Sequence, residues 1–247
     1  SPQSGSRTFE GNFDGNGHTI TLKRDQIYAL FGCIGMSGEV ANLNVEGVLE
    51  PSSARMCFGG VTGFNFGSII NCTSNLSTTD ITSKTFKMCA GAIAGVSTGL
   101  ISDCKSTAVV YGGQYTGGIV GLFKYGEVIR GTLASGSELH CEQMSGGIVG
   151  CLATCDEYTG VIKECITEKG AIVNSSSTQV GGIVGLATYD IIACENNASV
   201  SAKGKVGGIV GDQGMDVLTI EASKNTGDII VSGADVGGVI GSATGVN

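Results

Sequence analysis

A short glycine-bounded block recurs along the 247-residue chain and constrains the fold more than any other feature. Each copy reads small residue, small residue, bulky aliphatic, aliphatic or small residue, glycine, as in Gly117-Gly118-Ile119-Val120-Gly121. The closing glycines of the eight copies are Gly32, Gly63, Gly95, Gly121, Gly150, Gly185, Gly211 and Gly241. Their spacing runs from 26 residues (95 to 121) to 35 residues (150 to 185). A period in this range indicates a stacked repeat.

Two further β-prone runs follow each block. One has a Gly-x-aliphatic-x-x-small pattern, as at Gly67, Ile69 and Cys72, and the other is a short apolar run such as Ala171-Ile172-Val173. Helices are disfavoured because the chain has 42 glycines and no sustained 3.6-residue period. We therefore expect an all-β parallel β-solenoid of about eight coils with three short strands per coil, as a single domain over residues 1–247.

The bulky aliphatic of each block is expected to point inward and to stack on its equivalents. This predicted ladder consists of Leu30, Val61, Ile93, Ile119, Ile148, Ile183, Ile209 and Val239. The next position accepts Thr62 as well as aliphatic residues, so we expect it to face outward or to lie at a corner.

Charge and hydropathy exclude two classes of partner. The net charge of −8 disfavours nucleic acids and anionic membranes, which require a basic surface. No apolar run approaches the ~18 residues of a spanning helix, so we expect no direct membrane insertion.

Ten cysteines are many for a chain of this length, and several occupy equivalent repeat positions. The disulfide candidates are Cys57 with Cys89, Cys72 with Cys104, and Cys165 with Cys194. Stacked residues lie about 5 Å apart, within the Cα range of a disulfide. The alternative is that they are small buried hydrophobic residues. Cys33, Cys141, Cys151 and Cys155 stay unassigned. Disulfides would indicate an oxidising, extracellular setting.

No catalytic, metal-binding or cofactor-binding residues are expected. The only histidines are His18 and His140, there is no HExxH motif, and Asp14-Gly15-Asn16-Gly17 lacks the further oxygen ligands of a calcium loop. An alternative ligand patch is the aromatic cluster of Tyr111, Tyr115, Phe123 and Tyr125, close to Lys124.

Four Asn-x-Ser/Thr triplets are possible glycosylation sites. They begin at Asn71, Asn75, Asn174 and Asn197.

The blocks resemble GLUG-motif repeats, and the segment from Phe9 to Ile20 (FEGNFDGNGHTI) resembles the F-x-G-x-F-D-G-N-G-H-x-I segment that precedes such repeats. The resemblance covers about 9 to 241. It implies a β-helical module of large secreted or surface proteins, adhesin-like ones among them. The motif also occurs in non-catalytic parts of some bacterial immunoglobulin A peptidases. The resemblance supplies no catalytic residues, and the many cysteines depart from the usual bacterial pattern.

The function expected from the sequence is a non-enzymatic extracellular or cell-surface scaffold whose loops, around 73–87, 132–144 and 151–160, contact a protein or glycan ligand. The alternative is a carbohydrate-binding or polysaccharide-degrading β-helix. Because the sequence stops inside a repeat landmark at Gly245-Val246-Asn247, we expect the chain to be a fragment of a longer repeat protein. Other segments of that polypeptide, or end-to-end self-association, would cover the open strand edge.

Overall fold

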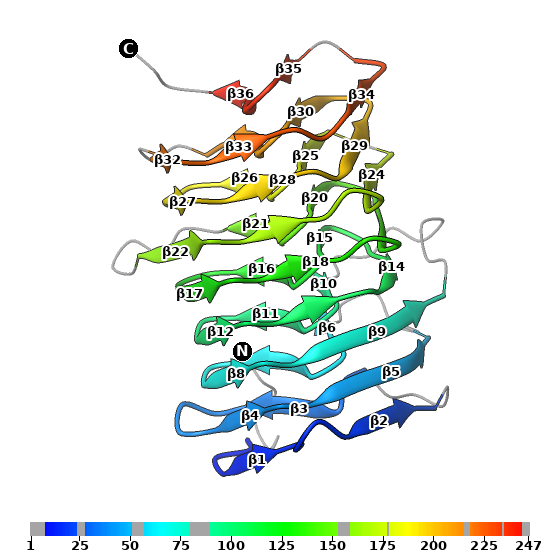
Figure 1. Cartoon of the computed structure of the whole chain (residues 1–247), viewed down its shortest axis with the longest axis vertical. Helices are drawn as coiled ribbons and strands as arrows, with labels where there is room; N and C mark the ends of the chain where they lie inside the picture. The colour runs from blue at the N-terminus through cyan, green and yellow to red at the C-terminus, as the bar shows by residue number, and fades with distance from the viewer. Residues whose placement is uncertain are drawn as a thin grey trace.

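A computed structural model describes residues 8–23, 28–50, 57–79, 89–152, 159–176, 178–214, 218–233 and 235–243. The strands stack as rungs along the long axis of the molecule (Figure 1), and the described residues contain no helix. Every strand pair of the described residues is parallel and joins one coil to the next, as between β15 and β20. The expected all-β parallel β-solenoid is therefore confirmed, and two sheets of eight strands agree with about eight coils.

The described strands form four sheets, whereas three strands per coil were expected. Sheet 1 contains β1 (Asn12–Asp14), β4 (Glu39–Ala41), β8 (Ser68–Ile70), β12 (Leu100–Ser102), β17 (Gly126–Ile129), β22 (Gly160–Lys163), β27 (Ile191–Ile192) and β32 (Ile220–Glu221). Sheet 2 contains β6 (Cys57–Phe58), β10 (Cys89–Gly91), β15 (Tyr115–Gly117), β20 (Met144–Gly146), β25 (Gln179–Gly181), β30 (Lys205–Gly207) and β35 (Val236–Gly237). Sheet 3 contains β3 (Phe31–Ile34), β7 (Thr62–Asn65), β11 (Ala94–Ser97), β16 (Val120–Phe123), β21 (Val149–Leu152), β26 (Val184–Ala187), β31 (Val210–Gln213) and β36 (Ile240–Ala243).

Sheet 4 is the largest. Its strands are β2 (Thr19–Leu22), β5 (Asn44–Leu49), β9 (Thr73–Thr78), β13 (Lys105–Ser106), β14 (Val109–Tyr111), β18 (Thr132–Leu133), β19 (Glu138–Cys141), β23 (Ile166–Thr167), β24 (Ile172–Ser175), β28 (Glu195–Asn196), β29 (Ser199–Ala202), β33 (Lys224–Asn225) and β34 (Ile229–Val231). The extra sheet arises because the glycine block is a turn between two strands rather than one strand, as between β15 and β16.

The bulky aliphatic of the block lies at that turn. The amides of Ile119 and Val120 both donate to the carbonyl of Ile148 in the next coil, each at 3.0 Å. The same sharing repeats from Val61 to Val239 and keeps the turns in register. The predicted ladder is confirmed for Val61, Ile93, Ile119, Ile148, Ile183 and Ile209, which are all 0% exposed. Leu30 is partly buried, and Val239 is 43% exposed because no further described coil covers it.

The following position lies directly after this turn, in agreement with a corner, but the expectation that its side chain faces outward is wrong. Its interior members, including Thr62, Val120 and Val149, are 0% exposed. Sheets 2 and 3 fold back so closely that a Cβ on Gly117 would lie 2.0 Å from the Val120 carbonyl oxygen. The residue after each ladder residue is therefore enclosed by the backbone of sheet 2 as well as by that of sheet 3. Thr62 is accommodated because its hydroxyl donates to the Phe64 carbonyl oxygen at 2.9 Å.

The second glycine of the block faces, across a narrow core, those strands of sheet 4 that directly follow the corner from sheet 1, such as β23. A Cβ on Gly147 would lie 2.1 Å from the Gly182 carbonyl oxygen and 2.4 Å from Thr167 Cγ2. The facing column includes buried polar side chains. Thr167 donates to Asn196 Oδ1, and Asn196 Nδ2 donates to Asn225 Oδ1 at 2.7 Å. These bonds satisfy polar groups that would otherwise be costly to bury.

Candidate binding surface and thiol pairs

One outer face of the rod carries side chains suited to contact a ligand. We call this face the outer strip: the outward-facing residues of β14, β19, β24, β29 and β34, which follow one another along one edge of the rod (Figure 1). Their register forms two columns: Val109, Glu138, Ile172 and Ser199, and Tyr111, His140, Asn174, Ser201 and Ile230. The alternate residues Val110, Leu139, Val173 and Val200 are buried, as the period of two in a strand requires.

The strip changes in character along the rod. The rings of Tyr111 and His140 stack with centroids 4.5 Å apart and planes 11° apart. His140 Nε2 lies 3.2 Å from Glu138 Oε2. Farther along, the Ser201 hydroxyl donates to Asn174 Oδ1 at 3.2 Å, and Ile230 beyond it is 60% exposed. Adjacent coils thus carry, in order, a stacked aromatic pair, a hydrogen-bonded hydroxyl and amide, and an exposed apolar side chain.

A hollow borders each column of the strip. The larger, of about 650 Å³, is lined by Ile172 and Ser199 together with Glu168, Asn197 and Asp228. The smaller, of about 340 Å³, is lined by residues that include Asn174, Ser201, Lys203 and Ile230. Ile172 is 38% exposed. The lining therefore combines an apolar contact with several hydrogen-bonding groups, as in ligand sites generally.

The expected contact loops are only partly loops. The 132–144 stretch contains β18, β19 and the first residue of β20, and the 73–87 stretch begins with β9. These stretches are rich in polar residues because strands of sheet 4 expose one face to solvent. Residues 80–87 of the expected loop around 73–87, and residues 153–158 of the one at 151–160, lie outside the described residues.

The aromatic cluster considered as an alternative ligand patch is divided in the structure. Phe123 is 0% exposed in the core, while Tyr111 and Tyr115 belong to sheets 4 and 2. The stacking partner of Tyr111 is His140, which comes from the next coil and which was not part of the cluster considered in the sequence.

A column of left-handed residues at the corner between sheets 1 and 4 was not anticipated. Its members have φ between 49° (Ala222) and 56° (Asp103) and are Asn42, Asn71, Asp103, Arg130, Glu164, Ala193 and Ala222. Asparagine and aspartate adopt this conformation more readily than most residues. This column could have been predicted from the sequence by an Asn or Asp directly before the last residue of the Gly-x-aliphatic-x-x-small pattern.

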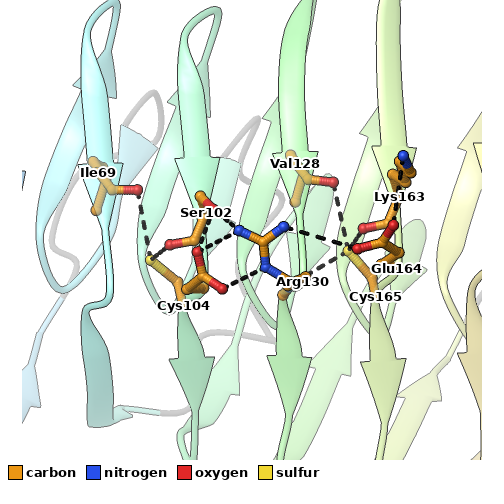
Figure 2. A network of polar contacts seen from close by, with 10 residues as sticks. Ile69, Ser102, Cys104, Val128, Arg130, Lys163, Glu164 and Cys165 are labelled. Atoms are coloured by element: carbon orange, nitrogen blue, oxygen red, sulfur yellow. Dashed lines mark hydrogen bonds and ion pairs between the residues drawn. The ribbon is translucent and has the colours of Figure 1, made fainter.

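Side chains of this corner column tie neighbouring coils together (Figure 2). Arg130 Nε donates to Asp103 Oδ1 at 2.5 Å, and Arg130 Nη1 lies 3.8 Å from Glu164 Oε2. The pKa of Asp103 is lowered to about 2, mainly by hydrogen bonds from Arg130 and to a smaller extent by one from Ser102. Nearer the N-terminus, Asn71 Nδ2 donates to Asn42 Oδ1 at 2.8 Å. We interpret this column as structural.

The next residue after each corner residue points into the core. Its column is Leu43, Cys72, Cys104, Gly131, Cys165, Cys194 and Ser223. Cys72 thus lies beside Cys104 and Cys165 beside Cys194, with Gly131 separating the two pairs. These four side chains are 0–1% exposed. A hydrogen bond from the Cys104 thiol lowers the pKa of Cys72, while burial raises that of Cys104.

The third expected pair has a different setting. Cys57 and Cys89 are in direct register on β6 and β10, Cys57 is partly exposed, and Cys89 is 8% exposed. All nine cysteines of the described residues are free thiols, and Cys155 lies outside those residues. The structure therefore brings together both members of each expected pair, and their oxidation stays a prediction.

The possible glycosylation sites fall into two groups. Asn71 and Asn75 are exposed near the N-terminal coils, whereas Asn174 lies on the outer strip and Asn197 lines its larger hollow. A glycan on Asn174 or Asn197 would cover part of the strip.

Within the described ranges, no three or more His, Cys, Asp or Glu side chains are grouped so that they could hold a metal ion. The same part of the chain has no helix long and apolar enough to cross a membrane.

Comparisons with known proteins add one structural similarity. No protein-family model matches the sequence, and no curated protein matches it. A crystal structure from Bacteroides ovatus, provisionally described as an immunoglobulin A1 protease, is 20% identical with a TM-score of 0.48. The match covers 94% of this chain and 68% of that one. At these values it carries no argument about activity, and membership of the GLUG-motif family stays a resemblance.

Proposed function

We propose that this chain is a non-enzymatic structural and adhesive module of an extracellular or cell-surface protein. In this proposal the β-solenoid is a stiff support, and the outer strip contacts a protein or glycan ligand. Stiffness is supported by the shared carbonyls at the block turns from Val61 to Val239 and by the Thr167–Asn196–Asn225 bonds, which join successive coils. A repeat array of this kind offers an extended surface rather than one deep pocket.

The observation that carries the adhesive part is the placement of Ile172 and Ile230. Both belong to the few large apolar side chains that are exposed among the described residues, and each lines one of the two hollows. Single exposed apolar residues are common on protein surfaces. Here two of them share one strip with hydroxyl, amide and carboxylate groups, and this combination is typical of a contact surface.

A carbohydrate-binding or polysaccharide-degrading β-helix is the second candidate. It is favoured by the Tyr111–His140 stack, because a partly exposed aromatic pair beside Asn174 and Ser201 offers both apolar ring atoms and hydrogen-bonding groups to a sugar.

The test compares wild type with the double variant Ile172→Asp/Ile230→Asp. The matched control is Met36→Asp, an equivalent apolar-to-acid change at a side chain that is 87% exposed and far from the strip. Beads coated with each protein are applied to a glycan array and to cultured epithelial cells. We expect at least a tenfold loss of binding for the double variant and none for the control, with unchanged far-ultraviolet circular dichroism.

Three outcomes would contradict the proposal in different ways. Equal binding by the double variant would remove the strip from the contact surface. Absence of wild-type binding to every surface would remove the adhesive role. Sustained release of sugar from a polysaccharide panel would favour the degrading alternative.

A further inference from the structure

We propose that Cys57 and Cys89 form a thiol–disulfide exchange site on the surface of the rod, and that its substrate is a low-molecular-weight disulfide. The site is independent of the outer strip, so it goes beyond the proposed adhesive role. The proposal gives this pair a role that the two other cysteine pairs do not have. Those pairs share one inward-facing repeat position, whereas Cys57 and Cys89 lie on sheet 2.

The first argument is register. Cys57 on β6 pairs directly with Cys89 on β10, and both strands are parallel members of sheet 2. Adjacent strands lie about 4.8 Å apart, which is inside the Cα range of a disulfide. The side chains of residues in direct register leave the same face of the sheet, so the two sulfurs can meet.

The second argument is access. Cys57 is partly exposed and Cys89 beside it is 8% exposed. The inward pairs are 0–1% exposed, and in Cys104 and Cys165 the thiols donate to backbone carbonyls of the core. A dissolved disulfide can therefore reach Cys57 in the folded protein, whereas Cys72, Cys104, Cys165 and Cys194 are out of reach.

The third argument is the division of roles between the two thiols. A hydrogen bond from the Cys89 thiol lowers the pKa of Cys57, and the same hydrogen bond, together with burial, raises the pKa of Cys89. The ammonium group of Lys124 favours the thiolate at both positions. The thiolate is the reactive form of cysteine. The exposed Cys57 is therefore the attacking group, and the enclosed Cys89 is the group that resolves the intermediate.

The exchange balances without a further reagent. Cys57 ionises, and its thiolate attacks one sulfur of the disulfide R–S–S–R. That S–S bond breaks, a mixed disulfide Cys57–S–S–R forms, and the leaving R–S⁻ takes up the proton that Cys57 released. The Cys89 thiol then loses its proton and attacks the Cys57 sulfur, so that the Cys57–Cys89 disulfide forms. The second R–S⁻ leaves and takes up the proton. The cysteine pair loses two electrons, and the small disulfide is reduced to two thiols.

Exposure makes the product reversible. A dissolved thiol can reach the Cys57 sulfur of the disulfide as readily as a dissolved disulfide reaches its thiolate. Exposed disulfides are more easily reduced than enclosed ones. We therefore infer an exchange site rather than a permanent cross-link.

The test uses oxidised glutathione on the folded protein, followed by alkylation and peptide mapping. In wild type we expect the Cys57–Cys89 disulfide, formed at least tenfold faster than any modification of Cys72, Cys104, Cys165 or Cys194. In Cys89→Ser we expect a stable glutathione adduct on Cys57. In Cys57→Ser we expect no adduct on Cys89. The control variant Cys104→Ser, in an inward pair, should leave the Cys57–Cys89 reaction unchanged.

Accessibility is checked by repeating the reaction in guanidinium chloride, where all the cysteines should react at similar rates. The proposal is overturned if Cys89→Ser accumulates no adduct on Cys57, because that thiol would then not be the attacking group. It is also overturned if the inward pairs of the folded protein oxidise as fast as Cys57 and Cys89.

Discussion

Replacing Gly147 by alanine tests the close approach of successive coils. The added Cβ would lie 2.1 Å from the Gly182 carbonyl oxygen and 2.4 Å from Thr167 Cγ2. Neither neighbour can move easily. Gly182 belongs to the next block turn, whose Ile183 carbonyl accepts from both Ile148 and Val149, and Thr167 is bound to Asn196.

The magnitude follows from these constraints. Overfilling a packed core costs about 1–3 kcal/mol, and more where the neighbour is rigid. Separating the two coils would also weaken the hydrogen bonds between them, which contribute about 1 kcal/mol each. We therefore expect Gly147→Ala to lower the free energy of unfolding by about 3 kcal/mol. For a chain of this length that corresponds to a Tm lower by about 6–12 °C.

Two alanine variants serve as controls. Gly238 holds the same block position in the last described coil, where a Cβ would meet nothing within 4 Å. Gly131 lies in the interior, where the nearest atom would be Ile119 Cγ1 at 3.3 Å and the next Cys165 Sγ at 3.5 Å. We expect both to change stability by less than about 1 kcal/mol, as substitutions without a severe clash do. The interior control excludes the explanation that an end position is tolerant only because it frays.

Urea and thermal unfolding, followed by circular dichroism at the β-sheet minimum, measure all three variants. A Gly147→Ala protein within 1 kcal/mol of Gly131→Ala would refute the reasoning. It would mean that neighbouring coils can separate at the block turn without loss of stability.

Two further predictions concern the left-handed corner column. Ala193 has φ of 53°, a conformation that costs alanine about 1–2 kcal/mol. Ala193→Gly should therefore raise the free energy of unfolding, measured in urea, by about 0.5–1 kcal/mol once the greater entropy of glycine in the unfolded chain is subtracted. Ala193→Ser keeps the strained conformation, and an equal gain in stability from it would contradict this account. Asp103 has a folded pKa of about 2, below the value of about 3.9 in an unfolded chain, so its contribution is present above pH ~4 and is lost as the pH falls toward 2. Because the Asp103 and Arg130 side chains are about half exposed, Asp103→Asn should cost less than about 1 kcal/mol at pH 6, and most of that cost should be gone at pH 2. A constant difference between the urea midpoints across that range would argue against the ion pair.

The periodicity of the sequence was sufficient to predict the fold and most of the aliphatic ladder. Val61 and Ile209 lie deep in the core as expected, because each coil pairs with its equivalent one repeat away. The position after the ladder was expected to face outward or to lie at a corner because Thr62 occurs there. A threonine can be buried at that site because its hydroxyl finds a backbone acceptor within its own strand, and this contact is invisible to a residue-type pattern.

The outer strip was less predictable. The sequence was interpreted as a loop around 132–144, but Glu138 and His140 alternate with buried Leu139 and Cys141 in a strand. The equivalence of repeat positions did predict that Cys57 lies beside Cys89. It could not distinguish that pair from Cys165 and Cys194 in access to solvent, because exposure depends on which side of the sheet each position faces.

The sequence by itself determined the stack of coils. Each strand bonds to a copy of itself one period away, so the spacing of the glycine blocks sets both the partner and the register of every sheet. Only the tertiary structure decided which outward side chains meet. Tyr111 and His140, or Ile172 and Ile230, are brought to one strip by the path of the chain around the rod, and no periodic pattern marks them because side chains facing solvent are under no common packing constraint.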